Sequence, residues 1–293
     1  MQRTVLFIDY NNLSIRCLFG DTTMFNNPNP SFDQHKHILL ATIFSNIKKF
    51  SPDEVIIAID DRKNWRKLFY EDYKANRKDS RDKDIFPWEK YFGYINNFTN
   101  ELKKIFPFKF IQIKYAEADD VIAILSRHLT ETINIIVTTD TDYIQLLQEK
   151  NIKLYDPLKK KQIIDDNPTK TLQIKILSGC KSDNITSIKP RVGDKTAMKL
   201  IDSGELENLL KDDVIKKLYD RNRRLTDWHF IPEAIKMMTL STYDKYPKIN
   251  EFNTMEIMKF FVQNKLRKHL EDLSVIKQLI APLMGEKTMK EYF

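Results

Sequence analysis

The sequence is poor in the residues that build covalent frameworks and flexible linkers. Its 293 residues include only two cysteines, Cys17 and Cys180, with six glycines and eleven prolines. Two cysteines cannot form a disulfide framework, which favours a reducing, intracellular setting. No apolar run approaches the roughly 18 residues of a membrane span, and the N-terminal run VLFI ends at Asp9, too early for a signal peptide. We therefore expect a cytoplasmic protein without a membrane segment.

Charged residues, in contrast, are plentiful in the sequence. Lys and Arg total 48 against 41 acids, which gives a net charge of +7 and a pI near 9.1. That balance is compatible with a polyanionic partner, although many basic proteins bind none, so the placement of charge matters more than its total. The length and the 42% hydrophobic content allow one large globular domain or two smaller ones.

Strand-like and helix-like segments alternate over the first 155 residues. Short β-rich runs stand at 4–8, 54–59, 108–113, 133–137 and 152–155, with helix-like segments at about 33–49, 88–105, 117–129 and 142–149. Most of the runs are apolar almost throughout, as in parallel strands buried on both faces. The alternation predicts an α/β fold with a doubly wound, mostly parallel sheet. From about residue 168 the pattern is helical, so we predict an α/β domain at 1–165 and a helical domain at 166–293.

Acidic residues follow four of the predicted strands. In chain order they are Asp9, Asp60, Asp61, Glu117, Asp119, Asp120, Asp140 and Asp142. Because the carboxyl ends of parallel strands share one edge of a sheet, these side chains should gather on one rim. Asp140 and Asp142 would point the same way if the backbone between them stays extended.

Any one of these acids has an ordinary explanation as a helix cap or turn residue. Four segments together weaken that explanation, because clustered carboxylates raise one another's pKa unless cations neutralise them. Oxygen ligands suit Mg²⁺ or Mn²⁺, and the histidines and cysteines lie outside the acidic motifs, which disfavours zinc. Two Mg²⁺ ions roughly 4 Å apart on such a rim are the two-metal arrangement for phosphodiester hydrolysis.

A basic segment, residues 62–83, follows the second predicted strand. It holds nine Lys and Arg against four acids and is interleaved with Trp65, Phe69, Tyr70 and Tyr73. Positive charge with aromatic rings suits single-stranded nucleic acid, because phosphates meet the cations while bases stack on the rings. A solvated amphipathic helix whose aromatic residues face the core explains the same spacing equally well.

Residues 177–201, LSGCKSDNITSIKPRVGDKTAMKLI, add a further acid, Asp183, and a glycine at a bend that opens a helix. Gly193 precedes Lys195 and Thr196, which fall in the first turn. Free N–H groups at a helix N-terminus can bind phosphate oxygens, and glycine lets the backbone approach closely. Taken alone, the pattern also fits a capped helix start.

In this order the segments resemble the flap endonuclease and 5′→3′ exonuclease family, and most closely its bacteriophage members of ribonuclease H type. The match is carried by FIDYNNL (7–13), AIDDRKNWRKLFYEDYKANRK (58–78), WEKYF (88–92), YAEADD (115–120), TTDTDYIQLL (138–147) and GCKSDN with VGDKTA (179–197). The resemblance implies a metal-dependent nuclease that acts on 5′ ends and flaps and removes RNA primers during lagging-strand replication. A bacteriophage origin would place it in the host cytoplasm.

The resemblance also implies roles for single residues. It assigns Asp9, Asp60, Glu117, Asp119 and Asp140 to a first Mg²⁺, and Asp142 and Asp183 to a second, with Asp120 nearby and bridging through water. Tyr73, Lys74 and Arg77 match a YKxNR motif in an arch at 62–87, where Lys74 and Arg77 would contact the scissile phosphate. The 177–201 segment matches a helix-turn-helix element that grips the duplex. The expected nucleic-acid contacts are Arg62, Lys63, Arg66, Lys67, Lys74, Arg77, Lys189, Arg191, Gly193, Lys195 and Thr196.

Two departures from the family pattern change these expectations. Cys180 stands where the family commonly has Asp in GDxxDN, so we expect a weaker second Mg²⁺ site. The usual glycine-rich hairpin turn is replaced by SIKPRVG, which keeps only Gly193; Lys189 and Arg191 would substitute charge for lost backbone donors.

The expected partners are DNA and RNA–DNA duplexes with 5′ ends, flaps or forks, bound by a monomer. A sliding clamp and a single-strand-binding protein are further expected partners, the clamp through the C-terminal MGEKTMKEYF, for which a packed tail is the alternative. Two rival functions stay open. A PIN-like endoribonuclease would not need the basic arch or the 177–201 segment, and a non-catalytic DNA-junction binder would not need the acids. A DxD phosphatase would need a second Asp in FIDYNN.

Overall fold

One mostly parallel sheet forms the centre of the computed structural model, which describes residues 2–20, 24, 27–77, 81, 84–247 and 253–284. Within them, six strands lie in the order β3-β2-β1-β4-β5-β6. The parallel strands are β1 (Thr4–Asp9), β2 (Glu54–Ile59), β3 (Lys109–Gln112), β4 (Ile133–Val137) and β5 (Ile152–Asp156). β6 (Lys161–Ile163) pairs antiparallel with β5 at one edge. The predicted fold class is confirmed, and β6 is an addition to it.

The register of the central strands brings their carboxyl ends level. Asp9 lies opposite Ala58, and Ile8 lies opposite Val137. The segments that follow β1, β2 and β4 therefore leave the sheet side by side. β-branched residues fill these strands, as suits a pleated surface, and every residue of β2 is buried.

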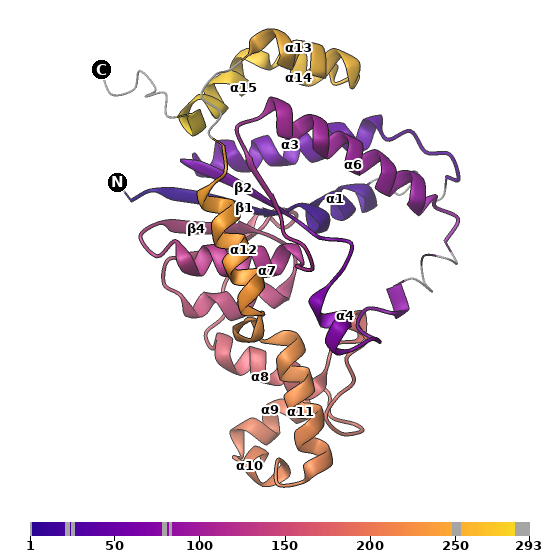
Figure 1. The fold of residues 1–293 in the computed structure, drawn as a ribbon, viewed down its shortest axis with the longest axis vertical. Coiled ribbons are helices and arrows are strands. Elements are labelled where there is room, and N and C mark those ends of the chain that lie inside the picture. The colour runs from indigo at the N-terminus through magenta and orange to yellow at the C-terminus, as the bar shows by residue number, and fades with distance from the viewer. Residues whose placement is uncertain are drawn as a thin grey trace.

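Alternate residues of β1 face two hydrophobic layers. Leu6 and Ile8 pack with α1 (Tyr10–Phe19), α3 (Asp33–Phe50) and α6 (Trp88–Ile105), whereas Val5 and Phe7 pack on the other face. The elements of that second face are α7 (Ala118–His128), the 3₁₀ helix η1 (Thr141–Gln148) and α12 (Glu233–Asp244). Figure 1 shows the sheet between these layers.

A group of helices extends away from the sheet (Figure 1). It comprises α8 (Pro168–Ser178), η2 (Lys181–Asp183), α9 (Asp194–Asp202), α10 (Leu206–Leu209) and α11 (Asp213–Thr226), with a small core around Leu177, Ile188 and Ala197. The short helix α4 (Trp65–Phe69), from the predicted arch, lies beside it. No helix of the described part of the chain is both long and apolar enough to cross a membrane.

The chain then returns to the sheet, which corrects the predicted division into two domains. Trp228, in η3 (Trp228–Phe230), and Ile235, in α12, join the core on one face. α13 (Thr254–Gln263), α14 (Arg267–Glu271), α15 (Leu273–Ile280) and η4 (Ala281–Met284) lie over α3 and α6 on the other. Residues 166–293 are thus not one helical unit, because hydrophobic residues beyond 227 complete the cores of the sheet. The proposed clamp-binding tail lies outside the described residues after Met284.

Candidate active site

The first two predicted site acids lie where β1 and β2 end. Asp9 caps α1, and its carboxylate accepts hydrogen bonds from the backbone N–H of Asn12 at 3.1 Å and the hydroxyl of Tyr143 at 3.0 Å. Asp60 Oδ1 accepts from the backbone N–H of Ala118 at 2.7 Å. Asp60 is therefore bonded to the first turn of α7, which brings the end of β2 against the acids that follow β3.

Three acids gather at the start of α7. Glu117, Asp119 and Asp120 each offer an oxygen within 4.8 Å of the others. Asp120 is fully buried: its Oδ2 accepts from the Glu117 backbone N–H at 3.1 Å and from Trp65 Nε1 at 3.0 Å, and its Oδ1 accepts from Arg66 at 2.8 Å. Both oxygens are engaged within the protein. The structure makes Asp120 a helix cap and an arginine anchor, and its expected water-bridged contact with a metal stays a prediction.

The acids after β4 are arranged by a helix and not by an extended strand. η1 begins at Thr141, and Asp140 caps it by accepting from the Asp142 backbone N–H at 2.9 Å. The extended backbone considered for this pair is thus absent. Asp142 is paired with the ammonium of Lys175, which α8 carries.

Asp183 reaches the same region through a tight loop. Gly179 has φ of +75°, and a Cβ there would lie 2.4 Å from the carbonyl oxygen of Ile185, so only glycine fits. Cys180 and Ile185 form an isolated antiparallel bridge that closes the loop around Asp183. A pocket of about 340 Å³ has Asp119, Asp140, Asp142, Asp183, Lys175 and Cys180 among its walls.

The electrostatics of the site reflect an excess of buried negative charge. Burial raises the pKa of Asp9 to about 7, and the charges of Asp60 and Asp140 add to the effect. Burial also raises the pKa values of Asp60, Asp119 and Asp140, with further contributions from neighbouring carboxylates. Within the described residues, Asp119 Oδ1 is buried without a hydrogen-bond partner. An unpartnered oxygen among carboxylates fits a hard divalent cation such as Mg²⁺ or Mn²⁺.

Cations from the arch segment neutralise part of this charge. Lys74 has φ of +56°, an uncommon backbone for a lysine, and its ammonium lies 2.6 Å from Glu117 Oε1 and 3.8 Å from Asp183 Oδ1. Arg77 donates to Asp183 at 3.0 Å, and the Tyr73 hydroxyl donates to Glu117 at 3.0 Å. Burial alone would raise the pKa of Glu117, but Lys74 and Arg66 hold it down, to about 2.

Arg66 corrects the nucleic-acid interface expected from sequence. Its side chain is 2% exposed, and it donates to Glu117 at 2.9 Å, to Asp120 at 2.8 and 3.0 Å, and to the carbonyl of Leu225 at 2.8 Å. A buried guanidinium with this set of acceptors cannot also contact a phosphate. It instead joins α4, α7 and the end of α11.

Some aromatic residues of the basic segment face the core, and others are exposed where they could stack on bases. Trp65 and Tyr73 are buried, as in an amphipathic helix packed on a core. Phe69 is 40% exposed and lies under the guanidinium of Arg224 at 4.1 Å, while Arg221 covers Tyr70 at 4.9 Å. The predicted arch at 62–87 is described except at 78–80 and 82–83.

Apart from Arg66 and the largely buried Lys74, the predicted nucleic-acid contacts are exposed. Those near the arch are Arg62, Lys63, Lys67 and Arg77, and those before and within α9 are Lys189, Arg191, Gly193, Lys195 and Thr196. Gly193 caps α9 with φ of −98° and open space where a Cβ would stand, so its backbone does not require glycine. The N-terminus of α9 is accessible from solvent.

Lys175 and Tyr143 belong to the site, although sequence reasoning did not select them. Burial alone would lower the pKa of Lys175, but Asp142, Cys180 and Asp183 raise it. Tyr143 is fully buried against Asp9. A single lysine in a helix has no distinctive spacing, whereas Tyr143, directly after the TTDTD motif, could have been found from its position.

A parallel sheet with this acidic carboxyl edge is the architecture of a nuclease class. The family model described as the 5′-3′ exonuclease N-terminal, resolvase-like domain matches residues 4–173, more than half of the chain. The chain belongs to this 5′-3′ exonuclease and flap endonuclease family and is a nuclease.

Individual relatives agree with that assignment. The chain is 28% identical over 269 residues to ribonuclease H of Enterobacteria phage T4, covering 83% of this chain and 87% of that protein. It is 26% identical to DNA polymerase I of Caldicellulosiruptor bescii, where the match covers 98% of this chain but 39% of the polymerase. A solved bacteriophage T5 flap endonuclease, in a pseudo-enzyme–product complex with DNA and metal ions, has the same fold: TM-score 0.65, 21% identity, 83% of this chain and 98% of that one.

Proposed function

We propose that the protein is a Mg²⁺-dependent, structure-specific 5′–3′ exonuclease and flap endonuclease. Asp119 is the observation that carries the proposal. Among the residues that the structure describes, one of its oxygens is buried without a hydrogen-bond partner, beside Asp9, Asp60 and Asp140, whose pKa values burial raises. Such a group of carboxylates calls for positive charge that the described residues supply only in part, and divalent cations would supply the rest.

The acids would divide between two ions. Asp9, Asp60, Glu117, Asp119 and Asp140 would hold one, and Asp142 and Asp183 would hold the other. When bound, the ions supply a water of lowered pKa and stabilise the departing 3′ oxygen. Lys74 forms an ion pair with Glu117, and Arg77 forms one with Asp183. From these positions both cations can orient the scissile phosphate. Tyr73 holds Glu117 from inside the protein and so acts as a positioning residue.

The substrate would be duplex nucleic acid with a free 5′ end, a flap or a fork. The exposed N-terminus of α9 and the cations Lys189, Arg191 and Lys195 would bind the duplex backbone without reading bases. The names of the T4 and T5 relatives support substrates of DNA and of RNA paired with DNA.

The same relatives support a proposal for the biological setting. The enzyme would be phage-encoded and would remove RNA primers and 5′ flaps from lagging-strand fragments. We place it in the reducing cytoplasm of the host, an environment that suits the free thiols of Cys17 and Cys180, and propose that it acts as a monomer. A sliding clamp and a single-strand-binding protein would be its partners.

The proposal is tested with 5′-labelled nicked, flapped and RNA-primed duplexes across a Mg²⁺ titration. Wild type should cleave them from the 5′ side, with Mn²⁺ able to substitute, and should stop in EDTA. Asp140→Asn should abolish cleavage, whereas Asp166→Asn, the same change at an exposed acid outside the site, should cleave like wild type. An active Asp140→Asn protein, or an inactive wild type, contradicts the proposal. Preferred cleavage within single-stranded RNA would favour a PIN-like endoribonuclease instead.

A further inference from the structure

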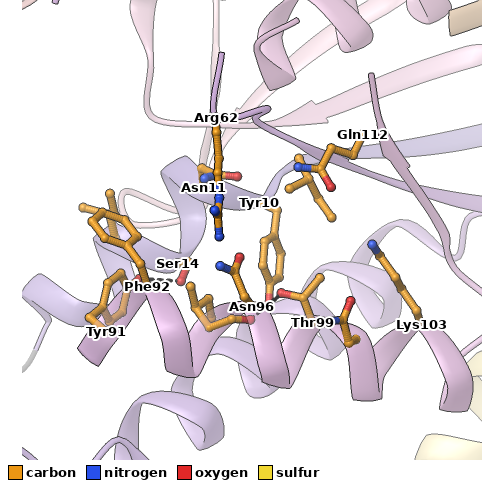
Figure 2. Close-up of a pocket in the computed structure, with 14 residues that line it drawn as sticks. Tyr10, Asn11, Ser14, Arg62, Tyr91, Phe92, Asn96, Thr99, Lys103 and Gln112 are labelled. Atoms are coloured by element: carbon orange, nitrogen blue, oxygen red, sulfur yellow. Dashed lines mark hydrogen bonds between the residues drawn. The ribbon is translucent and has the colours of Figure 1, made fainter. Parts of the chain in front are cut away.

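A second pocket lies between α1 and α6, next to the row of acids. Its volume is about 300 Å³, at the lower end of the roughly 300–1,000 Å³ typical of small-ligand sites. α1 supplies Tyr10, Asn11 and Ser14, while α6 supplies the wall from Tyr91 to Lys103. Arg62 and Gln112 close it from the ends of β2 and β3, and Figure 2 shows their side chains pointing toward the α6 wall.

The pocket is joined to the acidic site through Asp60. Asn11 Oδ1 accepts from the backbone N–H of Asp60 at 3.1 Å, and Gln112 Nε2 donates to its carbonyl at 2.9 Å. Tyr10, in the pocket wall, directly follows Asp9. Two residues of the pocket wall, Tyr10 and Ile59, are therefore sequence neighbours of the proposed metal ligands Asp9 and Asp60. A nucleic-acid strand that occupies the pocket would lie beside these ligands.

Part of the pocket wall is already fixed by internal hydrogen bonds. The hydroxyls of Ser14 and Tyr91 are 2.6 Å apart, and Thr99 donates to the Tyr10 hydroxyl at 3.1 Å. These bonds hold α1 against α6 without drawing on the groups nearer solvent.

The remaining polar groups are unpaired within the described residues. Asn96, Asn100, Lys103 and Arg62 have no hydrogen bond or ion pair there. Figure 2 shows Asn96 and Lys103 directed from α6 into the space that Arg62 enters from above. Amides offer a donor and an acceptor together, which is what the edge of a nucleobase requires, and no acid lines the described pocket to repel a phosphate.

The position of the pocket selects the strand that would enter it. α8 and η2, which lead to the proposed duplex-binding helix α9, line the opposite side of the acids. In Figure 1, α1 and α6 lie on one side of the α4 region and α8 and α9 on the other. A strand that leaves the duplex at α9 and crosses the acids would next meet this pocket.

We propose that the α1–α6 pocket binds the first unpaired nucleotide on the 5′ side of the bond that is cut. Asn96 and Asn100 would contact the edge of its base, and Arg62 and Lys103 would contact its phosphate. Phe92, in the same wall, is already stacked on Trp88, with ring centroids 5.9 Å apart, and lies 5.0 Å from the Arg81 guanidinium, so the base would be held by its edge. This inference rests on the proposed function and adds a base-binding subsite to it.

The test compares two double variants of α6, and each substituted position in the second lies one residue after its counterpart in the first. Asn96→Ala/Lys103→Ala removes pocket groups, whereas Asn97→Ala/Lys104→Ala removes the exposed neighbours outside the pocket. Each protein, with wild type, is assayed for kcat/KM on 5′-flap duplexes whose first unpaired nucleotide carries a base or is abasic. Wild type and the control should prefer the base roughly 5- to 100-fold, the range expected for one base contact or stack. The pocket variant should cleave both substrates about equally.

The outcomes separate this inference from the function on which it rests. If wild type cleaves the flaps but the pocket variant keeps the wild-type preference for a base, the subsite is wrong and the nuclease assignment stands. The same holds if wild type shows no preference between the two flaps. If wild type cleaves neither substrate at any Mg²⁺ concentration, the proposed function itself fails.

Discussion

The ammonium of Lys74 lies 2.6 Å from Oε1 of Glu117, so a cation of the arch segment pairs with an acid of the sheet edge. The left-handed backbone of Lys74 and a hydrogen bond from its N–H to the Asp183 carbonyl, 2.9 Å long, fix the turn that carries it. The residue that we expect to contact the scissile phosphate therefore also limits the negative charge of the site. A bound metal would compete with Lys74 for the carboxylate of Glu117, and a substrate phosphate would compete with Glu117 for the ammonium of Lys74.

Replacing Lys74 should impair the chemical step more than binding. We expect Lys74→Ala to lower the single-turnover cleavage rate about 10²- to 10³-fold, the typical effect of losing one group that stabilises transition-state charge. Flap-duplex affinity, measured by fluorescence anisotropy, should change little, because the exposed cations of α9 remain. Lys153→Ala, at an exposed lysine on β5, is the control. A large loss of affinity with an unchanged rate would assign Lys74 to binding alone.

In the metal-free protein, the contribution of Asp9 to stability should fall as pH rises from 5 to 8. The pKa of Asp9 is about 7 in the folded protein, against a usual value of 3.8. A raised carboxyl pKa favours folding while the group is protonated, and that contribution disappears as pH rises through 7. Glu117 acts in the opposite direction only below its usual value of 4.5, outside this range. Burial lowers the pKa values of His35 and His269 below their usual 6.5, so these two groups favour folding more as pH rises and oppose the effect of Asp9.

Asp9→Asn isolates this effect. The variant should have a higher Tm than wild type at pH 8 in EDTA, and a flatter dependence of Tm on pH. Added Mg²⁺ should raise the wild-type Tm more at pH 8 than at pH 6. Scanning calorimetry in EDTA and in Mg²⁺ measures both quantities, and the same dependence of Tm on pH in wild type and Asp9→Asn without metal would refute the prediction.

Cys180→Asp should lower the Mg²⁺ concentration needed for half-maximal cleavage by several-fold. Cys180 lines the same pocket as Asp142 and Asp183, and a carboxylate there would add a hard oxygen ligand. Cys180→Asn has nearly the same shape without the charge and should keep the wild-type requirement. An identical Mg²⁺ dependence in all three proteins would exclude a contribution of this position to the second ion.

Arg66→Met should destabilise the fold by about 3–5 kcal/mol, because it leaves the buried carboxylate of Asp120 without its partner. The free energy of unfolding in urea measures the loss. Arg62→Met, at an exposed arginine four residues earlier, should change it by less than about 0.5 kcal/mol. Equal stabilities for the two variants would show that Arg66 is not part of the structural framework.

Local patterns predicted the sheet because its strands are short apolar runs, and the helices 33–49 and 88–105 were equally regular. β6 was missed because it is three residues long and two of them are polar. The return of α12 to the sheet was also missed, since the packing of Trp228 and Ile235 against α7 depends on contacts distant in sequence. Periodicity reports which face of a helix is apolar and not which neighbour will cover it.

The acids of the site could be predicted because sheet topology fixes where strands end. Arg66 could not, because it stands among exposed Arg and Lys residues with the same local pattern. Arg66 is buried because it donates hydrogen bonds to Asp120 and to the carbonyl of Leu225, a residue of α11 that is 159 positions away in sequence. The roles of Asp120 and Lys175 were obscured for the same reason, since their partners lie on other elements.

The returning C-terminal helices decide whether the catalytic part could be excised. The family match ends at residue 173, yet a fragment ending there would lack Trp228, Tyr243 and Phe260, whose burial covers both faces of the sheet. It would also lose the Tyr246 hydroxyl, which accepts the N–H of Phe110 at 3.0 Å on the edge strand β3. An open strand edge beside uncovered aromatic residues is a template for self-association. We therefore expect such a fragment to self-associate, and a unit that keeps both faces of the sheet covered has to extend through α13–α15.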